Sequence, residues 1–323
     1  MRSDADALAV DPAARTPGLV DVIVPTNRIG GFLPAALESA RRQRYRPLRI
    51  FLVDDGSDDP EALDRLVADV PIATVIHRPP EGVSAARNAA IRSGTGEFVT
   101  FLDDDDLWPA NRLDELVTTL RSHPEAGGVF GNGRYIDADG RVFGRWNTAA
   151  ASQEDFLRRA TPIPRITALL VRRDMLERVG LFDETLAFSE DDELILRLLR
   201  HAPLVSSTTT VVDYRRHGDN ATLASWLTRY RSAHTAVSKN IAEAERLQQD
   251  EYAALLRVHL TRLKRSTAAN STGRVIGDLK ARRVGAAVAD VGQSLRIAPL
   301  AFARGVFRTI GSRIRSRLGS HPR

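Results

Sequence analysis

Aspartates follow two apolar runs of the chain without any intervening residue. Residues 48–53 lead directly into Asp54 and Asp55, and residues 98–102 lead into four consecutive aspartates at 103–106. Carboxylates packed this closely repel one another and raise one another's pKa unless a cation lies among them. Hard oxygen ligands suit Mg²⁺ or Mn²⁺, which keep coordination positions for substrate phosphates. The pattern therefore predicts a divalent-cation site that also binds phosphate.

Other interpretations of these aspartates are structural. Asp106 is expected to cap the helix that follows, and Asp54-Asp55-Gly56 also has the composition of a simple turn. An EF-hand is excluded because its sixth position would be Trp108 instead of Gly and its twelfth Asp114 instead of Glu. A GxxxxGK[ST] phosphate loop does not occur in the sequence.

Predicted strands and helices alternate along the part of the chain that must position these side chains. Apolar runs predict strands at residues 20–24, 48–53, 72–76 and 98–102, and helical periodicity predicts helices at 33–42, 60–68, 84–93 and 113–121. This alternation predicts an α/β fold with a Rossmann-like, mostly parallel sheet and flanking helices. In such sheets ligands bind outside the carboxyl ends of the strands, which is where the aspartates stand.

The rest of the chain is more helical. A hairpin is expected at residues 135–143, a strand at 166–171 and a helix at 192–200, and beyond about residue 222 the pattern is helical. The expected organisation is a disordered leader at 1–18, an α/β domain at 19–222 and a helical basic C-terminal region at 223–323. Asp58 or Asp59 is the expected N-cap of the helix at 60–68.

Composition narrows the environment of the protein. The 323-residue chain has no cysteine, which excludes disulfides and thiolate metal sites. The first twenty residues lack the apolar stretch of a secretory signal, and no window approaches 18 uninterrupted apolar residues. The expected location is the cytoplasm. A further hypothesis is that the protein attaches peripherally to the inner face of the membrane.

Charge is divided unevenly along the chain. Residues 221–323 hold 19 Lys and Arg against 6 Asp and Glu, whereas residues 1–220 hold 27 against 35. In residues 296–323, apolar side chains recur every four positions, as in a helix at a membrane interface: Phe302, Val306, Ile310, Ile314 and Leu318. An anionic membrane surface is one partner that this segment predicts. Packing on the α/β domain or on another subunit is the alternative, and no nucleic-acid partner is expected.

Six segments, in this order, resemble glycosyltransferase family 2, whose members have the GT-A fold and are inverting, metal-dependent nucleotide-sugar transferases. The segments are VIVPTNR at 22–28, LVDDGS at 52–57, GVSAARN at 82–88, FLDDDD at 101–106, GLFDE at 180–184 and SED at 189–191. The resemblance runs from about Val20 to Thr222 and implies that the α/β domain is a GT-A catalytic domain. The fourth segment contains the family's DxD motif.

The resemblance implies residue roles on the donor side. Pro25 and Thr26 would contact the nucleotide base through the backbone, and Asp54 and Asp55 would hydrogen-bond the same base. Arg87, in the first turn of a helix, would offset the charge of the diphosphate.

The DxD motif carries the roles around the cation. Asp105 would bind Mn²⁺ or Mg²⁺, with Asp103 as a further metal ligand, and Asp103 or Asp104 would reach the ribose or a metal-bound water. His217, in a segment similar to the family's Tyr-Arg-x-His-x-x-Asn ending, would complete the metal or diphosphate site.

The resemblance also implies an acceptor side. Asp191 is the expected catalytic base that takes the proton of the acceptor hydroxyl, with Glu190 beside it; the alternative for Asp191 is an N-cap. Trp108 would line the acceptor cleft or, alternatively, cover the core. One departure concerns the segment Pro25-Thr26-Asn27-Arg28, which lacks the Tyr that many family members have after the first strand.

The expected function is transfer of a sugar from a nucleotide-diphosphate sugar to a hydroxyl of a glycan or lipid-linked acceptor, in cell-surface glycan or glycolipid synthesis. A sugar nucleotidyltransferase is an alternative, although residues 26–31 offer only Gly30-Gly31 in place of its Gly-rich phosphate loop. The second alternative function is that of a non-catalytic protein that binds an anionic polymer. The sequence makes no prediction of the sugar, the nucleotide or the oligomeric state.

Overall fold

The computed structural model describes residues 15–147, 157, 165–218 and 226–306. The chain forms two compact units, Met1–Glu243 and Ala244–Arg323. The boundary predicted near residue 222 falls among residues 219–225, outside the described residues. The boundary between the units lies later, within helix α8 (Trp226–Arg246).

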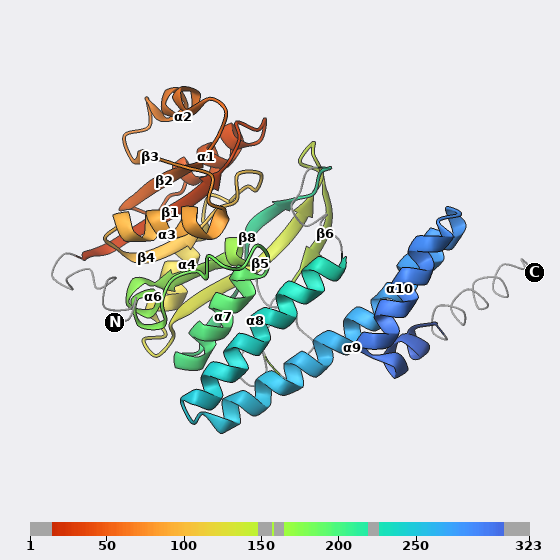
Figure 1. Cartoon of the computed structure of the whole chain (residues 1–323). Coiled ribbons are helices and arrows are strands. Elements are labelled where there is room, and N and C mark those ends of the chain that lie inside the picture. Colours follow the sequence, from red (N-terminus) through yellow and green to blue (C-terminus); the bar gives the residue numbers. More distant parts are fainter. Residues whose placement is uncertain (1–14, 148–156, 158–164, 219–225, 307–323) are drawn as a thin grey trace, which may run out of the picture. The chain divides into compact units, whose positions relative to one another are not determined.

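In the described part of the chain, the first unit is built on one mixed sheet of eight strands (Figure 1). The strands along its main path follow the order β3 (Ala73–Arg78), β2 (Leu48–Asp55), β1 (Thr16–Thr26), β4 (Gly96–Phe101), β7 (Leu169–Arg172), β5 (Gly128–Ile136) and β6 (Val142–Trp146). Strands β1 to β4 are mutually parallel where they pair, and β7 is antiparallel to both β4 and β5. Strand β8 (Leu204–Arg215) runs parallel to β5.

Helices cover both faces of the parallel half of the sheet. Alternate residues of β1, Val20, Val22 and Val24, are fully buried in one core cluster with residues of α1 (Leu33–Arg41) and α4 (Arg112–Arg121). Ile23, which points to the opposite face, is also fully buried, on the side where α3 (Val83–Ser93) contacts β1 and β2. Burial on both faces explains why these strands read as continuous apolar runs, and it confirms the predicted sheet.

The remaining helices of the first unit are α2 (Pro60–Val67), α6 (Arg173–Val179), α7 (Glu190–His201) and the larger part of α8. Asp59 is the N-cap of α2 and accepts the N–H of Ala62 at 3.0 Å, as predicted. Asn240 of α8 donates to the backbone oxygen of Glu193 at 3.3 Å, which ties α8 to α7.

Three predicted elements need correction, and one strand was not predicted. Strand β1 begins at Thr16, so the end of the expected leader is strand, held by the N–H of Thr16 to the oxygen of Thr95 at 2.9 Å; residues 1–14 lie outside the described residues. The expected strand at 166–171 opens with a 3₁₀ turn, Ile166–Ala168, before β7. The hairpin turns at Gly140 as expected, but its first strand, β5, begins earlier, at Gly128. Strand β8 was not predicted, because the polar run at residues 206–210 interrupts its apolar pattern.

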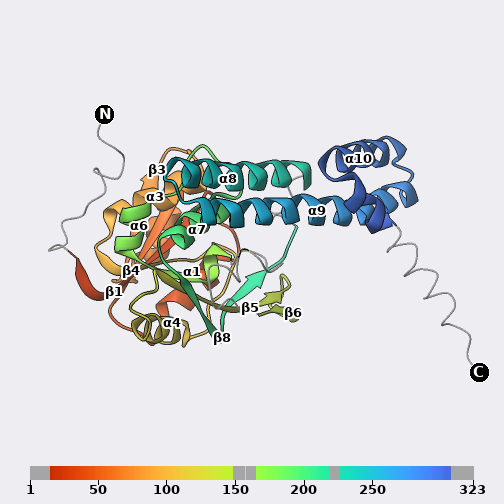
Figure 2. The same cartoon turned by 90° about the horizontal axis from the view of Figure 1, so that it is seen from below.

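The second unit is helical in its described residues, as predicted. Helix α9 (Asp250–Lys280) packs along α10 (Val284–Ile297), and Figure 2 shows α10 folded back beside the end of α9. Phe302 is 7% exposed and lies in the small core between them, with Val306 packed against it. The first two residues of the expected interfacial stripe therefore face the core of this unit, and residues 307–323 lie outside the described residues. Within the described part of the chain, no helix is long and apolar enough to cross a membrane.

Candidate active site

The carboxyl ends of β1, β2 and β4 lie at one edge of the sheet. Thr26 is in register with Asp54, and Phe101, the last residue of β4, is in register with Ile23. The Thr26 hydroxyl donates to Oδ2 of Asp104 at 2.7 Å, so the end of β1 and the loop after β4 are joined directly. The structure thus brings the predicted base-side residues and the DxD motif together.

Asp54 and Asp55 both hold local backbone. Oδ1 of Asp54 accepts the N–H of Ser57 at 2.7 Å, and its Oδ2 lies 2.9 Å from Nδ1 of His77. Burial raises the pKa of Asp54, but the hydrogen bonds from His77 and Ser57 together outweigh it, so the pKa is lowered. Asp55 is 8% exposed and accepts the N–H groups of the two residues that precede α3. The turn interpretation is therefore correct for the backbone contacts, and the base-binding role stays a prediction.

Arg87 is the central cation of the site. Its guanidinium donates to Oε1 of Glu190 at 2.8 Å and to Oδ1 of Asp103 at 3.1 Å, and its side chain is only 5% exposed. The next residue, Asn88, accepts the N–H of Phe182 at 2.9 Å and donates to the oxygen of Phe182 at 3.0 Å. The Arg-Asn pair therefore ties the DxD loop to the segment at 180–191.

The loop after β4 is covered by the end of β8. Nε2 of His217 lies 2.9 Å from Oδ2 of Asp105. The backbone N–H of Arg215 donates to Oδ1 of Asp106 at 2.9 Å, and its Nε donates to the backbone oxygen of Asp105 at 2.9 Å. Asp106 is not the helix cap that the sequence predicted, because α4 begins at Arg112 and the Asp106 carboxylate is buried against β8. Arg215 belongs to the Tyr-Arg-x-His motif that ends at His217, but the motif did not predict that Arg215 contacts this loop.

Three aspartates of the loop, Asp104, Asp105 and Asp106, have a raised pKa. Burial, opposed by the hydrogen bond from Thr26 and reinforced by the neighbouring carboxylates, raises the pKa of Asp104 to about 6. Burial and the charge of Asp103 raise the pKa of Asp105, and the same two causes raise that of Asp106 well above its ordinary value. A bound cation would reverse this penalty.

The donor atoms near Asp105 fit a small divalent ion in part. Neighbouring ligands of an octahedral ion with bonds of about 2.1 Å lie about 3 Å apart, and Oδ2 of Asp105 and Nε2 of His217 are separated by 2.9 Å. Asp103, the third predicted ligand, is turned towards Arg87 instead. Consistently, no group of three or more His, Asp or Glu side chains in the described residues is arranged to hold a metal.

Asp191 lies in the first turn of α7. Ser189 occupies the N-cap position and has φ 59°, so Asp191 is inside the helix and the capping alternative is wrong. Its Oδ1 accepts the N–H of Asp192 at 2.8 Å. Burial and the charge of Glu190, opposed by the charge of Arg87, raise the pKa of Asp191 to about 6. A carboxylate with this pKa is suited to accept a proton near neutral pH.

The two other predicted acceptor-side residues have partners within the protein. Glu190 is paired with Arg87, and its acceptor-side role stays a prediction. Trp108 is 5% exposed in the main core cluster, and the guanidinium of Arg112 lies 4.0 Å from its ring centre. The structure thus favours the core interpretation of Trp108, whose ring offers little surface to a ligand.

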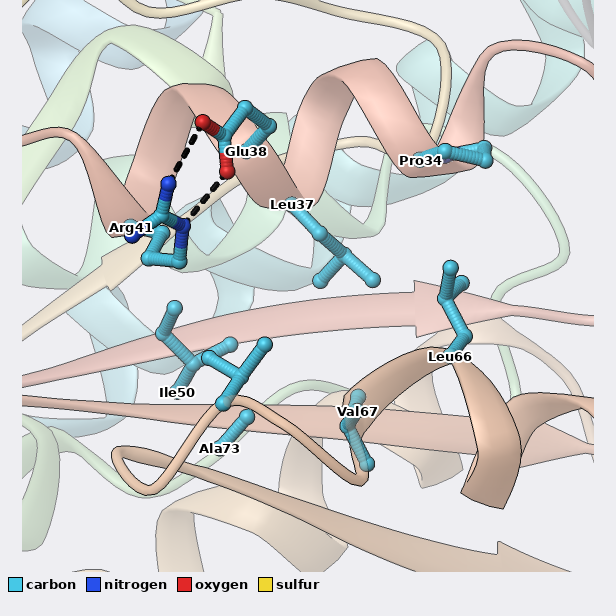
Figure 3. A pocket seen from close by; sticks show the side chains of 9 residues that line it. Pro34, Leu37, Glu38, Arg41, Ile50, Leu66, Val67 and Ala73 are labelled. Carbon is cyan, nitrogen blue, oxygen red and sulfur yellow. Dashed lines mark hydrogen bonds and ion pairs between the residues drawn. The ribbon is translucent and has the colours of Figure 1, made fainter.

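A surface crevice between α1, α2 and β3 is separate from these groups (Figure 3). Apolar side chains including Leu37, Ile50 and Leu66 line it, and its charged groups, Glu38 and Arg41, pair with each other. None of its lining residues is a predicted site residue, and it lacks an unpaired titratable group for chemistry.

Comparison with known proteins identifies the domain. The model of the family "Glycosyl transferase family 2" matches residues 21–180. Residues 21–180 belong to glycosyltransferase family 2. All the donor-side residues described above except His217 lie within this match, and Glu190, Asp191 and His217 lie beyond it.

Two relatives of this family 2 domain match part of the chain. The glycosyltransferase GlyG of Streptococcus pneumoniae is 32% identical over 129 residues, which cover 39% of this chain and 42% of that protein. The glucosyltransferase WfgD of Escherichia coli is 30% identical over 103 residues, 32% of this chain and 41% of that protein. The chain therefore spans less than half the length of these two relatives.

A solved structure has the same fold. The mannosyltransferase PcManGT from Pyrobaculum calidifontis matches with a TM-score of 0.60 at 21% identity, covering 95% of this chain and 82% of that one. The similarity, together with the sheet described above, confirms the predicted GT-A fold.

Proposed function

We propose that this chain transfers a sugar from a nucleoside-diphosphate sugar to an acceptor hydroxyl, with inversion at the sugar carbon. The observation that carries the proposal is the Arg87 bridge, which holds Asp103 of the DxD motif and Glu190, the neighbour of Asp191, on one guanidinium. The diphosphate-side and acceptor-side groups of the family are thereby within reach of one substrate.

Arg87 would bind the diphosphate. A diphosphate carries more negative charge than the single Asp103 carboxylate and competes with it for the guanidinium, while Glu190 keeps the side chain oriented. The N-terminus of α3, with the Gly82 N–H held by Asp55, adds partial positive charge on the same side. Thr26 and Asp104 would then lie beside the ribose and the base.

A divalent ion fits the same site. Asp105 and His217 would hold Mn²⁺ or Mg²⁺, with Asp103 joining them when the diphosphate takes its place on Arg87. The bound ion would neutralise charge on the departing nucleoside diphosphate. The P. calidifontis neighbour was solved in complex with GDP-Man and Mn²⁺, which supports this assignment.

Asp191 would act as the base. Its carboxylate accepts the proton of the acceptor hydroxyl as that oxygen bonds to the sugar carbon and the bond to the diphosphate oxygen breaks. A single displacement of this kind inverts the configuration of the carbon. The pKa of about 6 leaves Asp191 ionised at neutral pH yet basic enough to take the proton.

The acceptor is proposed to be a glycan or lipid-linked sugar of the cell surface. The E. coli relative is named for transfer of glucose to a GlcNAc-diphosphoundecaprenol, which supports this class. Nothing in the site favours nucleotidyltransfer, since phosphate would be bound here by Arg87 instead of a Gly-rich loop.

The test is release of UDP or GDP from a panel of UDP- and GDP-sugars with Mn²⁺ or Mg²⁺. Asp105→Asn and Asp191→Asn should each lower the rate by about 10²–10⁴-fold, whereas the control Asp139→Asn, on the exposed β5–β6 turn, should leave it unchanged. Wild-type rates in both site variants would refute the proposal. Pyrophosphate release from a nucleoside triphosphate would favour the nucleotidyltransferase instead.

A further inference from the structure

Two glycines in the β5–β6 hairpin leave room for aromatic rings. A Cβ at Gly133 would lie 2.0 Å from a ring atom of Trp146, and a Cβ at Gly144 would lie 3.1 Å from a ring atom of Tyr135. The Trp146 ring therefore lies across the backbone at Gly133 at a distance that only glycine permits, and the Tyr135 ring lies closely against Gly144. The rings are fixed in place by the sheet itself.

Four rings form one continuous surface, which we call the aromatic platform: Tyr135, Phe143, Trp146 and Tyr214. Tyr135 lies at its centre, with ring-centre distances of 5.9 Å to Phe143, 4.8 Å to Trp146 and 6.1 Å to Tyr214. Phe143 is 57% exposed and stacks on Tyr135 at an interplanar angle of 24°, whereas Tyr214 is 7% exposed. The platform thus has a buried end at Tyr214 on β8 and an open end at Phe143 on β6, and both strands are labelled in Figure 1.

Two guanidinium groups lie on the platform. Arg165 is 4.0 Å from the ring centre of Tyr214 and 5.7 Å from that of Trp146, and Arg216 is 4.5 Å from that of Tyr135. Among the residues that the structure describes, neither guanidinium has a carboxylate within ion-pair distance, in contrast to Arg87. Arg165 also shares a hydrogen bond with the Tyr135 side chain. A guanidinium has five N–H donors, so contact with the rings leaves others for a further acceptor.

The platform adjoins the candidate active site. Tyr214 directly precedes Arg215, which contacts Asp105 and Asp106, and two residues separate Tyr214 from His217. Three steps along the chain, each of about 3.3 Å when extended, span no more than about 10 Å. The charge of Arg165 also acts on Asp106. A molecule on the platform would therefore extend towards the reacting groups.

We propose that the aromatic platform is an acceptor subsite for a phosphorylated sugar. The proposal rests on the transferase function above. The apolar C–H face of a pyranose ring packs on the exposed ring of Phe143, at the open end of the platform. The phosphate accepts hydrogen bonds from Arg165 and Arg216, and two guanidinium groups favour a doubly charged phosphate ester over a neutral hydroxyl. The subsite would thus select acceptors that carry phosphate beside the sugar.

The experiment measures binding directly, so that it does not depend on turnover. Glucose, mannose and N-acetylglucosamine are presented as their 1-phosphates and as their neutral methyl glycosides, and dissociation constants are measured by calorimetry with the full chain. At least one sugar 1-phosphate should bind 10-fold or more tightly than its methyl glycoside. Arg165→Gln and Arg216→Gln should each remove most of that preference.

Further variants separate stacking from charge. Phe143→Ala, at the exposed end, should weaken the 1-phosphate and the methyl glycoside alike, whereas Arg141→Gln on the neighbouring exposed turn should change neither affinity. Equal binding of both forms by the wild type, or an intact phosphate preference in both arginine variants, would overturn the proposal. Binding of UDP and GDP with Mn²⁺ is measured in parallel: its failure would count against the transferase function, while the acceptor data judge the platform.

Discussion

Arg87 and Glu190 are 103 residues apart in the sequence, yet the guanidinium of one donates to the carboxylate of the other at 2.8 Å. Arg87 stands in the first turns of α3 and Glu190 is the first residue of α7. Because the same guanidinium also reaches Asp103, three segments that carry the family resemblance meet on one buried cation.

Replacement of Arg87 should therefore damage both stability and activity. Arg87→Met leaves Asp103 and Glu190 without their shared partner, and removing one member of a buried ion pair costs about 3–5 kcal/mol. We expect a loss of that order in the free energy of unfolding, measured with urea, together with loss of nucleotide release.

Arg92→Met is the matched control. Arg92 lies on the same helix, but its side chain is half exposed and its ion pair with Glu184 is long, at 3.9 Å. It should cost less than about 1 kcal/mol. The double variant Arg87→Met/Glu190→Gln should recover part of the lost stability. Equal effects of Arg87→Met and Arg92→Met would contradict the central position of Arg87.

The rate of transfer should depend on pH through the acid groups at α7. The pKa of Asp191 is raised to about 6, so the carboxylate that accepts the proton is lost as pH falls below about 6. We expect kcat to be constant above pH 7 and to fall about tenfold per pH unit well below 6, with the apparent pKa belonging to Asp191 and its neighbours together. A profile of kcat from pH 4.5 to 8.5 would show this. A rate that is unchanged at pH 5 would exclude Asp191 as the base.

The same pKa shift has the opposite effect on stability. The folded protein binds the Asp191 proton more tightly than the unfolded chain, so this group destabilises the fold progressively as pH rises from 3.8 to about 6, and by a constant amount above that. Asp191→Asn should thus raise the free energy of unfolding at pH 8 by about 1 kcal/mol, since the full shift of about 3 kcal/mol is shared with its neighbours. The gain should vanish near pH 4, and urea titrations at both pH values would detect it. If Asp191→Asn instead lowered the free energy of unfolding at pH 8, burial would not destabilise the ionised Asp191 carboxylate.

Asp55 should affect nucleotide affinity through the backbone before α3. Asp55→Ala removes the acceptor of two backbone N–H groups, which costs about 1–3 kcal/mol of stability when they are left unpaired. Asp55→Asn keeps one acceptor oxygen and should be more stable than Asp55→Ala. Both should weaken UDP or GDP binding at least tenfold in calorimetry. Wild-type nucleotide affinity in Asp55→Asn would limit Asp55 to a structural role.

Sequence patterns predicted the parallel half of the sheet well for a physical reason. Strands β1, β2 and β4 are buried on both faces, so their apolar runs are unbroken and the aspartates after them mark their ends. Strand β8 escaped prediction because its middle, at residues 206–210, is a run of Ser and Thr. Its partner β5 contains three glycines, which weaken strand patterns.

The site was predictable in its members but not in its contacts. Asp105 and His217 are together as expected, whereas Asp103 and Glu190 turn to Arg87 and Trp108 turns into the core. These contacts join side chains that are distant in sequence, so a local sequence pattern cannot predict them. The aromatic platform left a faint signal, the alternation of glycines with aromatic residues at 133–146, whose meaning requires the register of β5 and β6.

The central claim is that the carboxylates after β4 and Arg87 hold a cation and a diphosphate together. The most direct measurement is anomalous diffraction from crystals of the full chain grown with Mn²⁺ and UDP or GDP. We predict a manganese peak within about 2.3 Å of an Asp105 carboxylate oxygen, with the diphosphate between the ion and Arg87. A manganese peak away from Asp105, or a diphosphate that does not contact Arg87, would contradict the account.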